Sequence, residues 1–396
     1  MTPVDAAEGL ERRLDARGLD VALATAIQLK HDILASGVRL TEGAKSALNA
    51  VRRTRSGVSG GLDLLIDDVV YVNAPVRESF VADTPYELGW DLAEERWNLR
   101  GAPHVVKVDL VPEPGYYNEV VTANGRTADQ VGQMCSADRF CYGITGPSCR
   151  FWPESERCRY CSIGLNHAED GRRKQVSELI NVLGMALEDA QRPARHLLLG
   201  GGTPNSADMG ARMCAELCRE VKAEFGIPIY VMIAAPLRNE SIDELYESGA
   251  DELGINLEFW SPDSWDRYIP GKERLIGRDR YLDAISYSGE LFGPIRSRSI
   301  MITGLESEDS TIDGVKFLVD AGVMPILSPF RPLDGTALET SSPPTPAAME
   351  SVLVRADEIA HSAGLPIGPV CAPCQNNVLA MPPASIISGT PELARD

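Results

Sequence analysis

The feature that most constrains the fold is a regular alternation of apolar runs and amphipathic stretches that begins near residue 139. Strands buried on both faces have continuous apolar sequences, and helix-length connections let such strands run parallel. The expected strands are Phe140–Ile144, His196–Leu199, Ile229–Ile233, Leu253–Leu257, Ser299–Thr303, Pro325–Leu327 and Pro366–Val370. The expected helices are Val176–Ala190, Ala207–Phe225, Ser241–Ser248, Arg280–Leu291, Asp309–Ala321 and Ala347–Ala363. The alternation predicts an α/β fold, a partial or full parallel (β/α)6 TIM-like barrel.

The N-terminal part of the chain lacks this alternation and predicts an α+β accessory region. Apolar residues recur at a helical period between positions 10 and 34, which predicts helices there. The other expected elements are a hairpin at Leu64–Val76, with Asp67 and Asp68 at its turn, and strands at Val105–Val111 and Tyr116–Thr122. The predicted domains are the accessory region 1–136, the barrel 137–376 and a C-terminal tail 377–396.

Charge and hydropathy exclude several classes of partner. The formal net charge of the 396-residue chain is -19, which would repel a phosphate backbone, so we expect no nucleic-acid substrate. An apolar run of about 18 residues, long enough for a membrane helix, is absent, and the N-terminus lacks a basic and then apolar signal pattern. We therefore expect a cytoplasmic protein without a membrane partner. In a reducing compartment, its nine cysteines indicate metal or redox chemistry rather than disulfides.

Three cysteines form the most informative motif. Cys149, Cys158 and Cys161 have the spacing C-x8-C-x2-C, in a segment where Pro153 and polar residues predict a loop. Three thiolates on one loop can ligate three irons of a 4Fe-4S cluster and leave the fourth iron open for chemistry. Cys141, eight residues upstream of Cys149, competes with it as a ligand.

Zinc is the alternative ligand for the same thiols. C-x2-C pairs also bind zinc, although zinc sites usually have four protein ligands. The fourth ligand would then come from Cys141, Cys371 or Cys374, and the protein would be a zinc-stabilised, non-redox barrel.

Further polar residues follow the expected strands, and barrel active sites form at the C-terminal ends of strands. A glycine turn at Gly200–Pro204 would let the backbone approach a ligand. Glu258 could hold ribose hydroxyls or an amino group, or could be a solvated rim carboxylate. Arg331 could bind an anionic group in a bidentate manner, or could pair with a helix. The expected seventh strand places Cys371 and Cys374 at the same mouth.

These motifs, in this order, resemble the radical S-adenosylmethionine (radical SAM) enzymes. The usual family loop is C-x3-C-x2-C with an aromatic residue before the third cysteine, which is Tyr160 here; the first gap is longer in this chain. A family motif that contacts the amino group of S-adenosylmethionine is matched by Gly201, Gly202, Thr203 and Pro204. Gly304 and Glu306 match loosely a motif that packs near the adenine, and Pro329–Thr336 resembles the branch of biotin synthase, pyrrolysine-pathway and hydrogenase-maturation enzymes.

The resemblance implies a 4Fe-4S cluster, S-adenosylmethionine and an electron donor such as flavodoxin or ferredoxin. Reductive cleavage would give a 5′-deoxyadenosyl radical, which would abstract a hydrogen atom from a small-molecule substrate in the biosynthesis of a cofactor or natural product. Glu258 and Arg331 are the expected catalytic residues, and Glu258 is also expected to bind the nucleoside.

The second C-x2-C pair leaves several functions open. Cys371 and Cys374 could bind an auxiliary iron–sulfur cluster with Cys135 or Cys141, as in an enzyme that acts on a peptide. They could instead place a thiol against the substrate, or be inert. A scaffold protein that kept a catalytically dead barrel is a further alternative.

Overall fold

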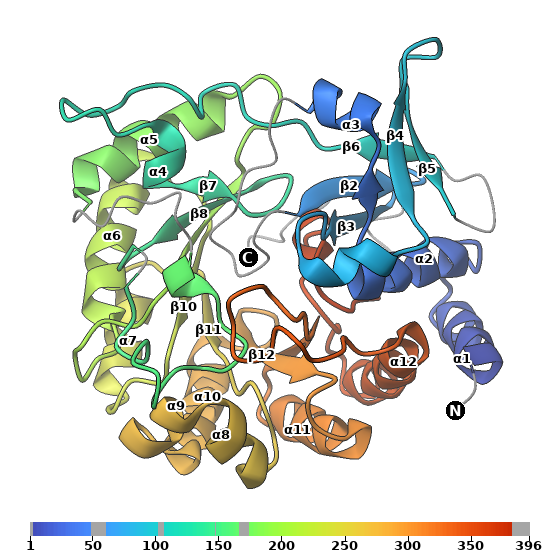
Figure 1. Cartoon of the computed structure of the whole chain (residues 1–396). Coiled ribbons are helices and arrows are strands. Elements are labelled where there is room, and N and C mark those ends of the chain that lie inside the picture. Colours follow the sequence, from blue (N-terminus) through green and yellow to red (C-terminus); the bar gives the residue numbers. More distant parts are fainter. Residues whose placement is uncertain (1–2, 49–60, 102–106, 147, 166–173, 382–396) are drawn as a thin grey trace.

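The computed structural model describes residues 3–48, 61–101, 107–146, 148–165 and 174–381. Its centre is a curled seven-stranded sheet with the strand order β13-β12-β11-β10-β9-β8-β7 (Figure 1). The strands are β7 (Gln133–Met134), β8 (Arg139–Gly143), β9 (His196–Gly200), β10 (Ile229–Ile233), β11 (Glu252–Ile255), β12 (Ser297–Thr303) and β13 (Met324–Pro329). Strands β8 to β13 pair in parallel, and only β7 is antiparallel to its neighbour. The predicted partial (β/α)6 barrel is therefore confirmed.

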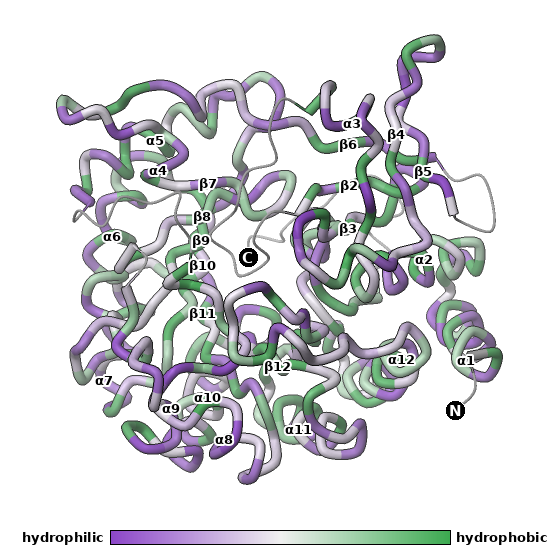
Figure 2. Tube along the Cα trace, in the orientation of Figure 1, coloured by the Kyte–Doolittle hydropathy of each residue, from purple (hydrophilic) through white to green (hydrophobic). Residues whose placement is uncertain are grey.

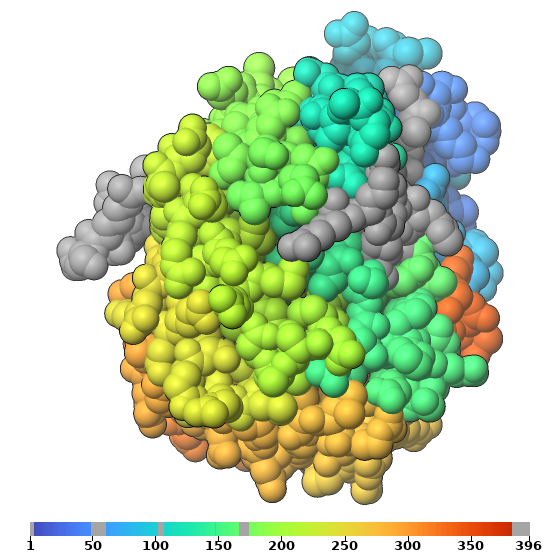
Figure 3. All heavy atoms as spheres, turned by 90° about the vertical axis from the view of Figure 1, so that its left-hand side faces the viewer, coloured from blue at the N-terminus to red at the C-terminus, as the bar shows by residue number. Residues whose placement is uncertain are grey.

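Helices form the outer layer of the barrel. They are α5 (Val176–Glu188), α6 (Ala211–Glu224), α7 (Glu240–Glu247), α8 (Pro262–Tyr268), α9 (Pro270–Leu275), α10 (Arg278–Phe292), α11 (Glu308–Asp320) and α12 (Pro346–Ser362), with short 3-10 turns η2 (Ile163–Leu165) and η3 (Pro373–Gln375). Hydrophobic residues concentrate in the strands and on the inner helix faces (Figure 2), as amphipathic packing requires. From the side, the segments coloured green to orange pack together over one face of the molecule (Figure 3).

The predicted seventh strand is wrong, and this changes the position of the second C-x2-C pair. Residues 366–370 form no strand, because Pro366 and Pro369 lack the N–H groups that a sheet ladder needs. After α12 the chain passes the start of β13, where the Gly368 N–H donates to the Pro325 carbonyl at 2.9 Å. The following loop therefore stays at the N-terminal ends of the strands rather than at the predicted mouth.

The N-terminal region contains two small sheets and several helices. Its elements are α1 (Pro3–Ala16), α2 (Leu23–Ser36), β1 (Arg39–Leu40), α3 (Glu42–Ala47), β2 (Leu62–Ile66), β3 (Val70–Ala74), η1 (Ser79–Asp83), β4 (Glu87–Asp91), β5 (Arg96–Arg100), β6 (Val108–Leu110) and α4 (Ala128–Val131). The predicted hairpin is confirmed as β2–β3, with Asp67 and Asp68 at positive φ in its turn. The expected strand at Tyr116–Thr122 is wrong, because only an isolated bridge from Val120 to Thr127 occurs there. Of the expected strand 105–111, residues 105 and 106 lie outside the described residues.

The N-terminal region packs directly on the barrel. Helix α1 lies against α12, where Arg13 and Arg17 pair with the buried Asp357 at 2.7 and 3.0 Å. The hairpin β2–β3 contacts both sides of the open barrel, because Asp63 pairs with Arg192 ahead of β9 while Asn73 accepts from Arg331 beyond β13. Within the described ranges, no helix is both long enough and apolar enough to cross a membrane.

Candidate active site

A cavity of about 310 Å³ runs through the barrel interior. Its lining at the C-terminal ends of the strands includes residues predicted as site residues, namely Tyr160, Cys161, Gly201, Glu258 and Arg331. Towards the N-terminal ends it is lined by Arg139, Cys141, Tyr230, Arg298 and Cys374. The middle of the cavity is apolar, with Leu198, Met232, Ile300, Ile302 and Ile326. The structure thus brings several of the predicted site residues to one cavity, as in a ligand site with an apolar body and few polar groups.

The three-cysteine loop docks on the glycine turn that follows β9. The Thr203 N–H donates to the Cys149 sulfur at 3.4 Å, and the Arg150 N–H donates to the Thr203 carbonyl at 2.8 Å. Cys158 and Cys161 are joined by a turn in which the Cys161 N–H donates to the Cys158 carbonyl at 3.1 Å. The loop is therefore fixed over the end of the barrel, with Cys161 lining the cavity.

The three loop cysteines are half-buried, and their thiols act on one another electrostatically. Burial raises the pKa of Cys158 to about 12 and that of Cys161 to about 11, and the neighbouring loop thiols contribute to both increases. Lys272 opposes these shifts as a nearby cation. Three grouped thiols without a histidine among them are the donor set of an iron–sulfur cluster, so these residues fit the cluster that the sequence predicts.

The glycine turn has a packing role that its sequence alone does not reveal. Gly201 has a φ of 111° and lines the cavity, so its backbone is open to a ligand. At Gly202, a Cβ would overlap the Ser148 carbonyl oxygen, so only glycine allows the cysteine loop to approach. Thr203 holds Cys149, and Pro204 packs beside Gly210. Contact of residues 201–204 with a nucleoside stays a prediction.

Glu258 is a buried carboxylate in the cavity wall, so the alternative of a solvated rim residue is wrong. Only 6% of the residue is exposed, and its Oε1 accepts a hydrogen bond from Lys272 Nζ at 2.8 Å. Burial opposes the charge of Lys272, but Glu258 keeps the pKa of that amine well above its usual value. The Tyr160 hydroxyl also interacts with Glu258, and the Tyr160 ring meets Phe259 edge to face at 6.0 Å.

Arg331 reaches into the cavity from the segment after β13. It is 8% exposed, and its guanidinium donates to the side-chain and backbone oxygens of Asn73 at 3.4 and 3.1 Å. Burial lowers its pKa to about 10, although the more distant Glu78 and Asp63 act in the opposite direction. Its hydrogen-bond partners among the described residues are neutral, so the guanidinium retains capacity for an anion. Anion binding stays a prediction.

Gly304 and Glu306 lie outside the set of residues that line the cavity. The Glu306 carboxylate accepts from the backbone N–H groups of Trp260 and Ser261 at 3.0 to 3.2 Å and from the Ser310 hydroxyl at 3.0 Å. Gly304 has a φ of 96° and packs against Pro344. These contacts explain both residues by local structure, and the predicted contact with adenine gains no support from them.

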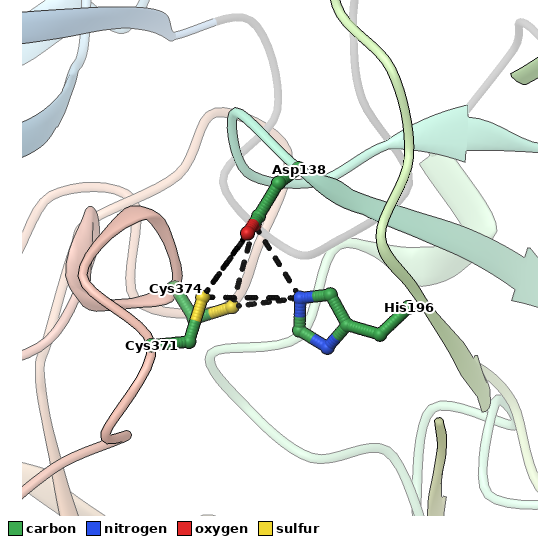
Figure 4. Close-up of side chains that lie close together, drawn as sticks. All are labelled: Asp138, His196, Cys371 and Cys374. Atoms are coloured by element: carbon green, nitrogen blue, oxygen red, sulfur yellow. Dashed lines mark hydrogen bonds and ion pairs between the residues drawn. The ribbon is translucent and has the colours of Figure 1, made fainter. Parts of the chain in front are cut away.

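The structure places Cys371 and Cys374 beside Asp138 and His196, two residues that the sequence interpretation missed (Figure 4). Asp138 immediately precedes β8 and His196 is the first residue of β9, so a polar residue at the start of each neighbouring strand was the available signal. Burial alone would raise the pKa of Cys374, but Cys371 and the Arg139 guanidinium hold it well below its usual value.

A partial barrel with a three-cysteine loop at its rim is an arrangement typical of enzymes whose reaction takes place inside the barrel. Comparison with known proteins supports a more specific class. Residues 155–318 match the model of the radical SAM superfamily, so the chain contains a radical SAM domain. Members of the superfamily use a 4Fe-4S cluster and S-adenosylmethionine.

The chain is similar to several named proteins. It is 23% identical to the bacteriochlorophyllide c C-7(1)-hydroxylase of Chlorobaculum limnaeum over 342 residues, which is 80% of this chain and 81% of the relative. Among solved structures, methylornithine synthase (PylB) aligns with a TM-score of 0.43 and 16% identity over 65% of this chain and 78% of that chain. SuiB of Streptococcus suis aligns with a TM-score of 0.38 and 14% identity over 51% of this chain and 41% of that chain.

Proposed function

We propose that Cys149, Cys158 and Cys161 hold the 4Fe-4S cluster and that the enzyme abstracts a hydrogen atom from a small molecule bound in the barrel. The observation that carries this proposal is the convergence of Tyr160, Cys161, Gly201 and Glu258 on one cavity at the C-terminal ends of the strands. When bound, the cluster and S-adenosylmethionine supply a 5′-deoxyadenosyl radical for this abstraction.

The chain contributes binding, orientation and exclusion of water. The free backbone groups at Gly201 and the carboxylate of Glu258 bind the nucleoside, and Lys272 fixes that carboxylate at 2.8 Å. The ring of Tyr160, which packs on Phe259, lines the same cavity as Cys161. The apolar middle of the cavity keeps water and competing hydrogen donors away from a reactive carbon.

The substrate in this proposal carries an acidic group. Three arginines line the cavity, but Arg139 donates to the Cys135 sulfur and Arg298 pairs with Glu252. Arg331 contacts only neutral acceptors among its described hydrogen-bond partners, so it is the cation best placed to bind a carboxylate or phosphate. An apolar body with an anionic end fits the remaining lining.

The proposal also covers the type of reaction, the extent of the catalytic unit and the electron donor. The similar protein from Chlorobaculum limnaeum is named for a hydroxylation, and hydroxylation at a carbon that carries hydrogen requires breaking a C–H bond, the step proposed here. We place the catalytic unit at residues 137–376, with a cytoplasmic location and flavodoxin or ferredoxin as the electron donor. The role proposed for the enzyme is in the biosynthesis of a cofactor or natural product.

The test is release of 5′-deoxyadenosine by the anaerobically purified enzyme after addition of S-adenosylmethionine and a strong reductant. Iron content and product should both disappear in the Cys158→Ala/Cys161→Ala variant. The matched control is Cys214→Ala/Cys218→Ala, which removes two buried thiols of α6 and should retain both. Absence of iron from the wild type, with zinc lost on replacing Cys158 and Cys161, would establish the zinc-stabilised barrel instead.

A further inference from the structure

We propose that Asp138, His196, Cys371 and Cys374 bind one zinc ion at the N-terminal end of the barrel, at a site separate from the three-cysteine loop. One ligand atom of each residue lies within 4.8 Å of the other three, from three separate segments of the chain. The four side chains point toward a common centre (Figure 4). This inference does not depend on the proposed radical reaction.

The spacing of the ligand atoms matches a tetrahedral zinc site. Bonds of about 2.3 Å to sulfur and about 2.0–2.1 Å to nitrogen or oxygen place neighbouring tetrahedral ligands roughly 3.3–3.8 Å apart. His196 Nε2 lies 3.4 Å from Asp138 Oδ1, 3.3 Å from the Cys374 sulfur and 3.8 Å from the Cys371 sulfur. The same Asp138 Oδ1 lies 3.5 Å from the Cys371 sulfur and 3.9 Å from the Cys374 sulfur.

The backbone prearranges these ligands. Strands β8 and β9 pair in parallel with Arg139 opposite His196, which brings Asp138 next to His196 at the sheet edge. Cys371 and Cys374 are held in one turn, because the Cys374 N–H donates to the Cys371 carbonyl at 3.1 Å. Pairs with C-x2-C spacing are a common half of structural zinc sites.

Groups around the ligands support the same interpretation. The Ser136 hydroxyl donates to Asp138 Oδ1 at 3.1 Å and lies 3.8 Å from the Cys374 sulfur, so it orients two ligands at once. Two cysteines, a histidine and a carboxylate are a donor set that suits zinc, because thiolate and imidazole ligands favour zinc over the divalent cations that prefer oxygen ligands. Arg139, which is buried beside them, supplies one positive charge and zinc would supply two more.

An auxiliary iron–sulfur cluster fits these residues less well. The cysteines in a position to complete such a cluster are Cys135 and Cys141, but Cys135 contacts Arg139, accepting from its Nε at 3.2 Å. In a 4Fe-4S cluster each thiolate binds a different iron, which spreads the ligands apart, whereas these four ligand atoms surround the space of a single ion.

The zinc ion would fix the floor of the active-site cavity. Cys374, Asn377 and Val378 line the cavity, and the loop that contains them is also held from the N-terminal region. Lys30 Nζ donates to the Gln375 carbonyl at 2.6 Å, and the Asn73 N–H donates to the Asn376 carbonyl at 2.7 Å. Four protein ligands leave no position open for substrate, so the role assigned to the metal is structural.

The test is metal analysis of the full-length protein, purified anaerobically and equilibrated with zinc. We expect about one zinc per chain. Cys371→Ala/Cys374→Ala should lose the zinc and keep the iron, while Cys158→Ala/Cys161→Ala should lose the iron and keep the zinc. Cys135→Ala and the α6 double variant Cys214→Ala/Cys218→Ala are matched controls that should keep the zinc.

A second measurement covers the case in which Cys371→Ala/Cys374→Ala does not fold. Cobalt added to the metal-stripped Cys158→Ala/Cys161→Ala protein should give the intense visible bands of tetrahedral thiolate-bound cobalt, and His196→Gln in that background should weaken cobalt binding at least tenfold. The proposal would be overturned if the wild-type protein retained less than about half a zinc per chain and the metal-stripped Cys158→Ala/Cys161→Ala protein gave no cobalt bands. Loss of iron from the Cys371→Ala/Cys374→Ala variant would also overturn it, because that loss would indicate an auxiliary cluster.

Discussion

Replacement of Lys272 by methionine should strongly destabilise the protein, because it leaves the Glu258 carboxylate buried without its partner. Lys272 Nζ and Glu258 Oε1 are 2.8 Å apart, and the two side chains are only 11% and 8% exposed. Methionine retains the length and apolar character of the lysine stem, so the main loss is the charge. Breaking a buried ion pair from one side costs about 3–5 kcal/mol, and this is the expected decrease in the free energy of unfolding.

The double variant Glu258→Gln/Lys272→Met supplies the internal comparison. Because both charges are then removed, most of the penalty should disappear, and the double variant should be more stable than Lys272→Met by roughly 2–4 kcal/mol. The assay is urea unfolding followed by circular dichroism. The control is Lys316→Met, which removes an equally close but exposed pair with Asp313 and should change stability by less than about 1 kcal/mol. A Lys272→Met protein within about 1 kcal/mol of the wild type would refute the reasoning.

Three further predictions address other parts of the site. Gly202→Ala should displace Ser148 and the cysteine loop, lowering the free energy of unfolding by about 1–3 kcal/mol and reducing iron content, while Gly184→Ala, which has room for a Cβ, should do neither. Arg331→Gln should weaken binding of an anionic substrate about tenfold or more, measured as substrate-dependent release of 5′-deoxyadenosine. Burial lowers the pKa of His31, so the unfolded chain takes up a proton there before the folded chain does. Stability should therefore fall as the pH drops below 6.5, and His31→Leu should reduce that slope in urea titrations at pH 5 and 7.5.

The barrel was predictable because each of its parallel strands is buried on both faces and therefore has a continuous apolar sequence. Ile229–Ile233 shows this directly, since the predicted strand has the same bounds as β10. The run at 366–370 has similar hydropathy, but its two prolines cannot donate the hydrogen bonds of a sheet ladder, so no strand forms there. The hydropathy pattern of a segment indicates that it is buried but does not indicate whether its backbone pairs with a strand. A buried loop can therefore have the same pattern as a strand.

The site was predictable where its residues belong to one local motif. Cys149, Cys158 and Cys161 lie in one loop, so their spacing alone predicts a shared ligand. Asp138 and His196 lie close together only because β8 and β9 pair in a particular register. No local sequence pattern predicts that register. Conversely, Glu306 follows a barrel strand as predicted, but its carboxylate caps backbone N–H groups instead of reaching the cavity. A position at a strand end does not fix the direction of a side chain.

The N-terminal region, which has no function legible in its sequence, contacts residues that line the cavity. Six parallel strands do not close a barrel as eight do, and radical chemistry inside an open barrel would be exposed to water. The hairpin β2–β3 contacts both sides of this opening, through Asn73 to Arg331 and through Asp63 to Arg192. The same hairpin binds the Asn376 backbone beside the proposed zinc site. One small element thus positions the proposed anion-binding arginine and braces the cavity floor, so the accessory region and the barrel act as a single structural unit around the cavity.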